Sequence, residues 1–171
     1  MAKTKINITQ IIGIVCLVVM LGLIVTQFLP YWTIGEGEDS TELSVLDYTW
    51  FNYEKEYKSF IKDMKEQIKD AGLMDVKDDS FKKLGINDFV YPAAVLSIVA
   101  LFAVVFCPFK LGKPLGIAFN LAVGCIGIWM YLSHPIYKLG SLWMVGLIIS
   151  LVLAVLSLAN AVLYIIKKAN S

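Results

Sequence analysis

Four long runs of apolar residues, each free of charged side chains, separate the polar parts of the chain. The first covers most of segment 1–30, and the others are 89–106, 114–132 and 142–166. A helix needs roughly 17–25 residues to cross a bilayer, and each run reaches that length. Lipid cannot satisfy exposed backbone polar groups, so such runs favour helices. The pattern therefore predicts an α-helical integral membrane protein, a bundle of four transmembrane helices.

Residues 31–88, between the first two runs, have the pattern of a small folded domain. Alternating apolar and polar residues adjoin a glycine-rich turn, which indicates paired strands. A helical period then lies between an asparagine N-cap and a glycine stop. These signals predict three elements: a β-hairpin at 31–46, a helix at 53–71 and a short helix at 80–84.

The composition agrees with a membrane protein and excludes several classes of function. Of the 171 residues, 58% are hydrophobic and 17% are charged, whereas soluble domains have roughly 25% charged residues. The chain has one histidine and no arginine. This argues against nucleic-acid binding, recognition by guanidinium groups and a Cys/His zinc site.

The charges are sorted along the chain, and the sorting predicts an orientation. All 14 acidic residues lie in segment 31–88, where 8 lysines leave a net charge of −6. The positive-inside rule then places both termini in the cytoplasm and segment 31–88 outside the plasma membrane. The lysines that define the cytoplasmic side are Lys3, Lys5, Lys110, Lys113, Lys167 and Lys168.

Aromatic residues gather near the predicted outer ends of the spans. Tryptophan and tyrosine are enriched where membrane proteins meet the headgroup region of the bilayer. We therefore predict an outer aromatic belt, made of Tyr31, Trp32, Tyr91, Trp129, Tyr131 and Trp143.

The predicted helix 53–71 has an apolar, a lysine and an acidic face on a helical wheel. One interpretation is that the apolar stripe packs on the hairpin. A second is that this stripe or the lysine face docks a partner protein, and a third is that it lies on the outer lipid surface. The candidate partner-binding residues are Tyr53, Tyr57, Lys58, Phe60, Lys62, Met64 and Lys65.

Small residues recur every three or four positions in the last two spans, which places them on one face of each helix. Small side chains let helix backbones approach closely, and asparagine can hydrogen-bond across the contact. We predict two helix-packing seams, with a substrate path as the alternative. The seam residues are Gly116, Asn120, Gly124 and Gly127 in one span, and Gly146, Ser150, Ala154 and Ser157 in the other.

Residues with catalytic or metal-binding chemistry are few and scattered. The spans carry no charged residue, which argues against proton-coupled or ion-coupled transport. His134 has no second histidine, and the three cysteines are far apart, so we interpret them as packing residues. The acidic groups at 36–39 and 75–79 do not fit a calcium-binding EF-hand loop. We expect no enzymatic activity, no cofactor and no metal site.

Pro30, Tyr31 and Trp32 at the exit of the first span, followed by the stretch 43–50 that ends in Trp50, resemble the claudin and peripheral-myelin-protein superfamily. Members of that family have a tryptophan at this exit, which Trp32 matches. The family's Gly-Leu-Trp motif and two loop cysteines are absent. The resemblance implies four helices, cytoplasmic termini, a sheet-bearing outer loop and lateral assembly.

These features lead to three hypotheses of function. The first is a non-enzymatic accessory subunit that associates with another membrane protein, such as a transporter, or with its extracytoplasmic component. The second is a small oligomeric transporter or channel for a neutral solute, with Asn120 and Asn160 along the route. The third is a sensor or immunity protein whose outer domain binds an extracellular ligand.

Overall fold

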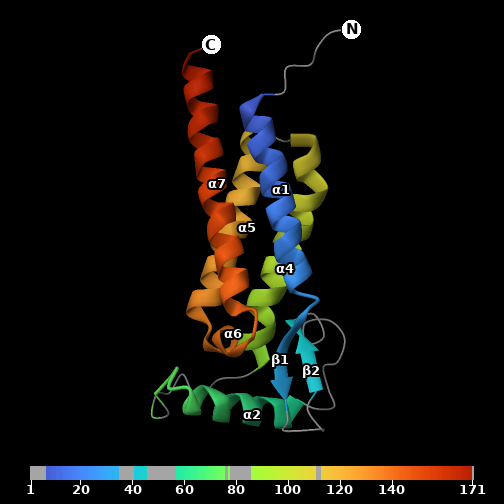
Figure 1. Ribbon diagram of the computed structural model, residues 1–171, viewed down its shortest axis with the longest axis vertical. Helices are drawn as coiled ribbons and strands as arrows, with labels where there is room; N and C mark the ends of the chain where they lie inside the picture. Colours follow the sequence, from blue (N-terminus) through green and yellow to red (C-terminus); the bar gives the residue numbers. More distant parts are fainter. Residues whose placement is uncertain are drawn as a thin grey trace.

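The computed structural model of the protein describes residues 7–34, 41–45, 57–75, 77, 86–110 and 113–170. Four long helices run side by side in this part of the chain, with two strands and helix α2 at one end (Figure 1). The long helices are α1 (Ile8–Thr26), α4 (Ile86–Lys110), α5 (Pro114–Ser133) and α7 (Trp143–Ala169). The predicted short helix 80–84 lies outside the described residues.

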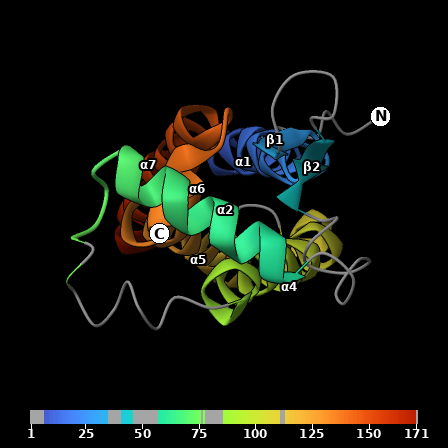
Figure 2. The ribbon, with the colours of Figure 1, turned by 90° about the horizontal axis from the view of Figure 1, so that it is seen from below.

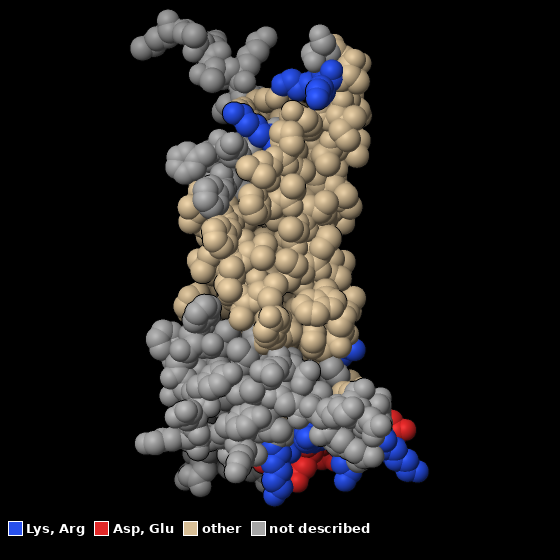
Figure 3. Space-filling view, turned by 180° about the vertical axis from the view of Figure 1, so that it is seen from behind, with Lys and Arg blue, Asp and Glu red and all other residues tan. Residues whose placement is uncertain are grey.

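Helices α1, α5 and α7 are each long and apolar enough to cross a membrane. Helix α4 contributes a shorter apolar stretch, Tyr91–Val105. On the face shown in Figure 3, residues other than lysine and acidic residues form a broad band along the bundle, with lysines at one end and both lysines and acidic residues at the other. Large apolar side chains stand exposed on this bundle, among them Val18, Leu101 and Val155. Water-soluble surfaces rarely carry contiguous apolar patches of this extent, so the fold indicates a membrane protein.

Local signals explain where the helices begin and end. The backbone N–H of Asn7 donates to Oε1 of Gln10 at 3.1 Å, which closes the first turn of α1. At the other end of α1, the Thr26 hydroxyl donates to the Leu23 carbonyl at 2.7 Å. Pro114 occupies the first turn of α5, where its missing N–H breaks no helical hydrogen bond.

The observed helices differ in length from the predicted spans. Helices α4 and α7 are longer than the predicted 89–106 and 142–166, because helical hydrogen bonding continues past the apolar run into polar residues. Helix α1 ends earlier than its apolar run, because the chain leaves the helix at Gln27 and turns toward the first strand.

The two strands form a small antiparallel sheet at the end of α1. Strand β1 (Pro30–Ile34) pairs with β2 (Thr41–Ser44), and Trp32 lies opposite Leu43. Both strands come from the segment in which the sequence predicts a hairpin. The predicted turn, residues 35–40, lies outside the part of the chain that is described.

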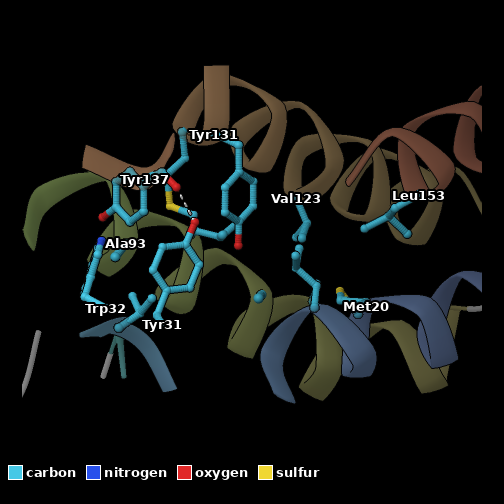
Figure 4. Close-up of a cluster of buried hydrophobic side chains, with 14 of the residues drawn as sticks. Met20, Tyr31, Trp32, Ala93, Val123, Tyr131, Tyr137 and Leu153 are labelled. Atoms are coloured by element: carbon cyan, nitrogen blue, oxygen red, sulfur yellow. Dashed lines mark hydrogen bonds between the residues drawn. The ribbon is translucent and has the colours of Figure 1, made fainter. Parts of the chain in front are cut away.

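The core lies between the helices and continues toward the strands. Helix α5 packs along α7 and α4, and α1 packs along α7. Close to the middle of the bundle, Met20, Val123 and Leu153 belong to this core (Figure 4). The other fully buried side chains of the long helices include Cys16, Leu23, Ala93, Leu96, Ala103 and Met130.

Two further helices close the end of the bundle near the strands. Helix α6 (Pro135–Leu139) lies between the third and fourth predicted spans, in a connection for which the sequence pattern predicts no helix. Helix α2 (Tyr57–Asp70) crosses this end and packs on α6 (Figures 1 and 2). The short helix thus forms part of the platform on which α2 lies, together with the core cluster that Met64 shares with Tyr31 and Trp32 of β1.

Candidate interaction site

A buried cluster of aromatic side chains joins the strands to the end of the helix bundle. Tyr31 comes from β1, Tyr131 from the last turn of α5 and Tyr137 from α6, and none is more than 2% exposed (Figure 4). The Tyr31 hydroxyl donates a hydrogen bond of 2.7 Å to the Tyr137 carbonyl. The rings of Tyr31 and Tyr131 both lie edge-on to Tyr137, with centroid distances of 6.1 Å. With Trp32, these three tyrosines form what we call the aromatic junction.

Trp32 lies inside the junction and not on the lipid-facing surface. Its ring centroid is 4.8 Å from that of Tyr31 and 5.8 Å from that of Tyr137. The predicted aromatic belt is therefore wrong for Tyr31, Trp32 and Tyr131, because β1 folds against the bundle end and buries these rings. Tyr91 is 69% exposed and remains on the surface.

Hydrogen bonds from Ser141 to backbone carbonyls also attach β1 to the segment between α6 and α7. The Ser141 N–H donates to the Tyr31 carbonyl at 2.9 Å. The Ser141 hydroxyl donates to the Pro30 carbonyl at 3.2 Å. These bonds join residues more than a hundred positions apart, so they fix the place of the strand pair on the bundle.

Two glycines give the junction rings the space that they occupy. A Cβ atom at Gly140 would overlap the Tyr31 ring, and a Cβ atom at Gly146 would overlap the Tyr131 ring. Gly140 has an ordinary extended backbone conformation, with φ −73° and ψ 144°. The absence of a side chain at Gly140 is therefore required for packing and not for an unusual backbone shape.

The phenols of the junction stay neutral at physiological pH. Burial disfavours the phenolate and raises the pKa of Tyr31 and Tyr137 above the ordinary tyrosine range, and the neighbouring tyrosine hydroxyls raise it further. The Tyr31 hydroxyl therefore remains a hydrogen-bond donor at pH values where an exposed tyrosine would already ionise.

Helix α2 lies over this junction with a buried side and a charged side. Met64 and Ile68 are fully buried, and Met64 belongs to the same cluster as the junction rings. The opposite side carries both signs of charge, on the exposed residues Lys62, Glu66, Lys69 and Asp70. Charged groups of both signs gather at this end of the molecule in Figure 3.

The candidate partner-binding residues of α2 do not share one exposed surface. Lys62 is exposed, Lys65 is half-buried and Met64 is fully buried inside the chain. The backbone of α2 includes Tyr57, Lys58 and Phe60, whose side chains lie outside the description, and Tyr53 lies outside it entirely. Among the side chains described, the charged residues form the outward surface.

The small residues of α5 and α7 meet where these two helices touch. A Cβ atom at Gly124 would lie 2.8 Å from the Ala154 backbone nitrogen, and one at Gly127 would overlap the Ser150 side chain. A Cβ atom at Gly146 of α7 would likewise meet α5, at the Tyr131 ring. The seam residues are all buried, namely Gly116, Asn120, Gly124, Gly127, Gly146, Ser150, Ala154 and Ser157.

The polar seam residues hydrogen-bond within the bundle. The Ser150 hydroxyl donates to the Gly146 carbonyl at 2.8 Å, and the Ser157 hydroxyl donates to the Leu153 carbonyl at 2.7 Å. Each serine thus donates to a carbonyl of its own helix, and the Ser157 hydroxyl also lies 3.9 Å from the Cys16 thiol of α1.

The described residues contain no group of three histidine, cysteine or acidic side chains that could hold a metal ion. His134 precedes α6 and lies edge-on to Trp129, with a centroid distance of 4.8 Å, and it also packs against Tyr137. Its surroundings are those of an aromatic packing residue at the edge of the junction.

Comparison of the chain with models of protein families, with curated proteins and with solved structures finds no match. The sequence analysis missed Tyr137, Gly140 and Ser141, which build half of the junction. One signal for them was present, because Pro135 followed by Gly140 is typical of the start and stop of a short helix.

We predict that alanine at Gly127 destabilises the protein whereas alanine at Gly22 does not. A Cβ atom at Gly127 would overlap Ser150, while one at Gly22 meets no atom within 4 Å. Overpacking costs about 1–3 kcal/mol, and Gly→Ala in an open helix position gains about 0.5–1 kcal/mol. Thermal unfolding in detergent should show Gly127→Ala below, and Gly22→Ala at or above, the wild-type midpoint. Equal midpoints for both variants would contradict the tight seam.

We predict that Tyr31→Phe lowers the unfolding midpoint and that Tyr91→Phe leaves it unchanged. The first change removes the hydrogen bond to the Tyr137 carbonyl, worth about 0.5–1.5 kcal/mol, and keeps the ring. The exposed Tyr91 is the matched control. Gly140→Ala should cost more than Tyr31→Phe, since it displaces the ring itself. An unchanged midpoint for Gly140→Ala would refute the packing described for the junction.

Proposed function

We propose that the chain is a non-enzymatic accessory subunit of a membrane protein assembly, and that α2 is its recognition surface outside the membrane. One observation carries this proposal: α2 buries Met64 and Ile68 against the bundle end and directs a charged side outward. A helix held in this way presents its charges in one fixed orientation. Fixed groups lose little conformational entropy on binding, which favours association with a complementary protein.

The proposed arrangement has four spans, with α4 as the fourth, both termini in the cytoplasm and α2 outside the plasma membrane. Two observations support it. Helix α1 begins and α7 ends at the same end of the bundle, opposite to α2 (Figure 1). Exposed lysines, Lys113, Lys167 and Lys168, flank the helices at that end, as the positive-inside rule requires of the cytoplasmic side.

This orientation predicts which positions react with a membrane-impermeant maleimide in intact cells. In a cysteine-free variant, Glu66→Cys on α2 should be labelled without permeabilisation. Asn170→Cys, beyond the end of α7, should be labelled only after the membrane is opened. Both positions are exposed in the fold, so access to the reagent depends on the side of the membrane alone. The reverse labelling pattern would invert the proposed topology.

The chemistry of the α2 surface points to a protein partner of mixed charge. Lysines and acidic residues alternate on the exposed side, so a partner gains from matching both signs rather than from a single strong potential. The bundle contributes lateral contact in the membrane, and the resemblance to the claudin and peripheral-myelin-protein superfamily supports lateral assembly.

We predict that reversing two charges on α2 removes a partner that remains bound when the same two residues are replaced with their charge kept. A photo-crosslinking residue at position 66 captures the partner, which mass spectrometry identifies. The double variant Lys62→Glu and Lys69→Glu should reduce this crosslink at least about tenfold, equivalent to about 1.4 kcal/mol. The control is Lys62→Arg with Lys69→Arg, which keeps both positive charges at the same exposed positions and should leave the crosslink unchanged.

Two outcomes would contradict this assignment. A wild-type chain that yields no crosslink to another membrane or extracytoplasmic protein would remove the accessory role. Equal loss of the crosslink in both double variants would show that the substitutions act through the fold and not through the charge of the α2 surface.

A further inference from the structure

The end of the bundle opposite to α2 carries a surface of positive charge. Exposed lysines lie there at the start of α5 and in the last turn of α7 (Figure 3). The sequence has no acidic residue before Glu36 or after Asp88, so helices α1, α5 and α7 carry none. We call this set of residues the lysine surface: Lys113, Lys167 and Lys168.

Lysines of two different helices lie at one level because α5 and α7 pack closely. The approach of the Gly124 position to the Ala154 backbone sets the register of these two antiparallel helices. The same register brings Lys113 level with Ile165, because both helices rise by about 1.5 Å per residue. The two lysines of α7 follow within one turn of Ile165. Both helices therefore contribute charge to the same surface.

Exposed apolar side chains adjoin the lysine surface. Leu115 lies beside it on α5, and Ile165 and Ile166 directly precede it on α7. In a membrane protein, exposed apolar side chains of this kind contact the acyl chains of lipids. Lysine side chains at the end of a membrane helix extend their ammonium groups toward the headgroups. The lysine surface therefore lies at the depth of the lipid phosphates.

We propose that the lysine surface binds the phosphate headgroup of an anionic phospholipid, and that the adjoining Leu115, Ile165 and Ile166 contact its acyl chains. Each ammonium group near the membrane surface attracts negative lipid charge. A lipid with the same acyl chains and no net charge should bind more weakly. This proposal depends on the membrane location of the helices, and neither on the accessory role of α2 nor on the side of the membrane that this end faces.

Position and charge favour a lipid over an acidic protein in the aqueous phase. Such a protein would approach from beyond the ends of the helices and would make no use of the exposed Ile165 and Ile166. A phospholipid carries its phosphate directly beside its acyl chains. One molecule can therefore contact the lysines and the apolar side chains next to them.

The test compares two phospholipids that share their acyl chains and differ in charge. Dioleoyl phosphatidylglycerol has a net negative charge, and dioleoyl phosphatidylcholine has none. The purified full-length protein in detergent is titrated with each lipid, and the bound molecules are counted by native mass spectrometry. The anionic lipid should bind at least about tenfold more tightly, and this preference should fall as the ionic strength rises. Equal affinities in the wild-type protein would overturn the proposal without any variant.

Two triple variants with the same change in net charge locate the effect. The first neutralises the lysine surface, with Lys113→Gln, Lys167→Gln and Lys168→Gln. The matched control neutralises three exposed lysines in and after α2, with Lys62→Gln, Lys69→Gln and Lys77→Gln. The preference for phosphatidylglycerol should be lost in the first variant and retained in the control. An unchanged affinity for phosphatidylcholine in both variants shows that each remains folded.

A photo-reactive lipid locates the site without any substitution. Phosphatidylglycerol with a diazirine in its acyl chain, close to the headgroup, should crosslink to the start of α5 and to the end of α7. Peptide mass spectrometry identifies the crosslinked residues. Crosslinks confined to the end of the bundle that carries α2 would overturn the proposal.

Two further results would also overturn it. A preference that survives neutralisation of the lysine surface means that the anionic lipid binds elsewhere. Equal loss of the preference in both triple variants means that the net charge of the protein, and not this surface, attracts the lipid. If the wild-type protein shows no preference and a photo-crosslinking residue at position 170 captures an acidic protein, the occupant of the surface is a protein.

Discussion

The hydrogen bond between the Tyr31 hydroxyl and the Tyr137 carbonyl is the central contact between the strand pair and the end of the bundle. It joins β1, which directly follows α1, to α6, which lies between α5 and α7. A two-stranded sheet has little stability of its own, so its position must come from the bundle. Ser141 adds two hydrogen bonds to β1, and Gly140 leaves space for the ring. The Tyr31 hydrogen bond depends on Gly140, because a side chain at position 140 would occupy the space of the Tyr31 ring.

The position of α2 follows from this junction. Met64 joins the cluster that contains Tyr31, Trp32 and Tyr137, and α2 packs on α6. The orientation of the charged surface is therefore set by aromatic contacts at the end of the bundle and not by the charges themselves. A change in the junction should alter what α2 presents, even though the junction has no contact with solvent. The junction residues therefore position the charged surface of α2, whereas the exposed charged residues of α2 form it.

The sequence predicted the helices well and the junction poorly, for a physical reason. A long uncharged run predicts a helix from its length and composition alone. The spacing of small residues, such as Gly124 in α5 or Ala154 in α7, can likewise be read within a single helix. The burial of Tyr31 instead depends on a contact with a residue 106 positions away. No local sequence pattern indicates a contact between residues so far apart. The sequence therefore predicts that Tyr31 and Tyr131 lie in an aromatic belt. Pro135 and Gly140 did carry a signal for α6, but only a short one.

Polar groups are satisfied differently where α5 meets α7 and where α1 meets α4. Along the seam of α5 and α7, the Ser150 and Ser157 hydroxyls hydrogen-bond to carbonyls of their own helix, and glycines bring the backbones together. Both hydroxyls are therefore satisfied inside a closely packed contact. Between α1 and α4 the helices leave a crevice, and Gln27 retains an oxygen that accepts no bond from the described residues. Close approach of α5 and α7 therefore holds that side of the bundle together, whereas α1 and α4 are packed less closely around the crevice.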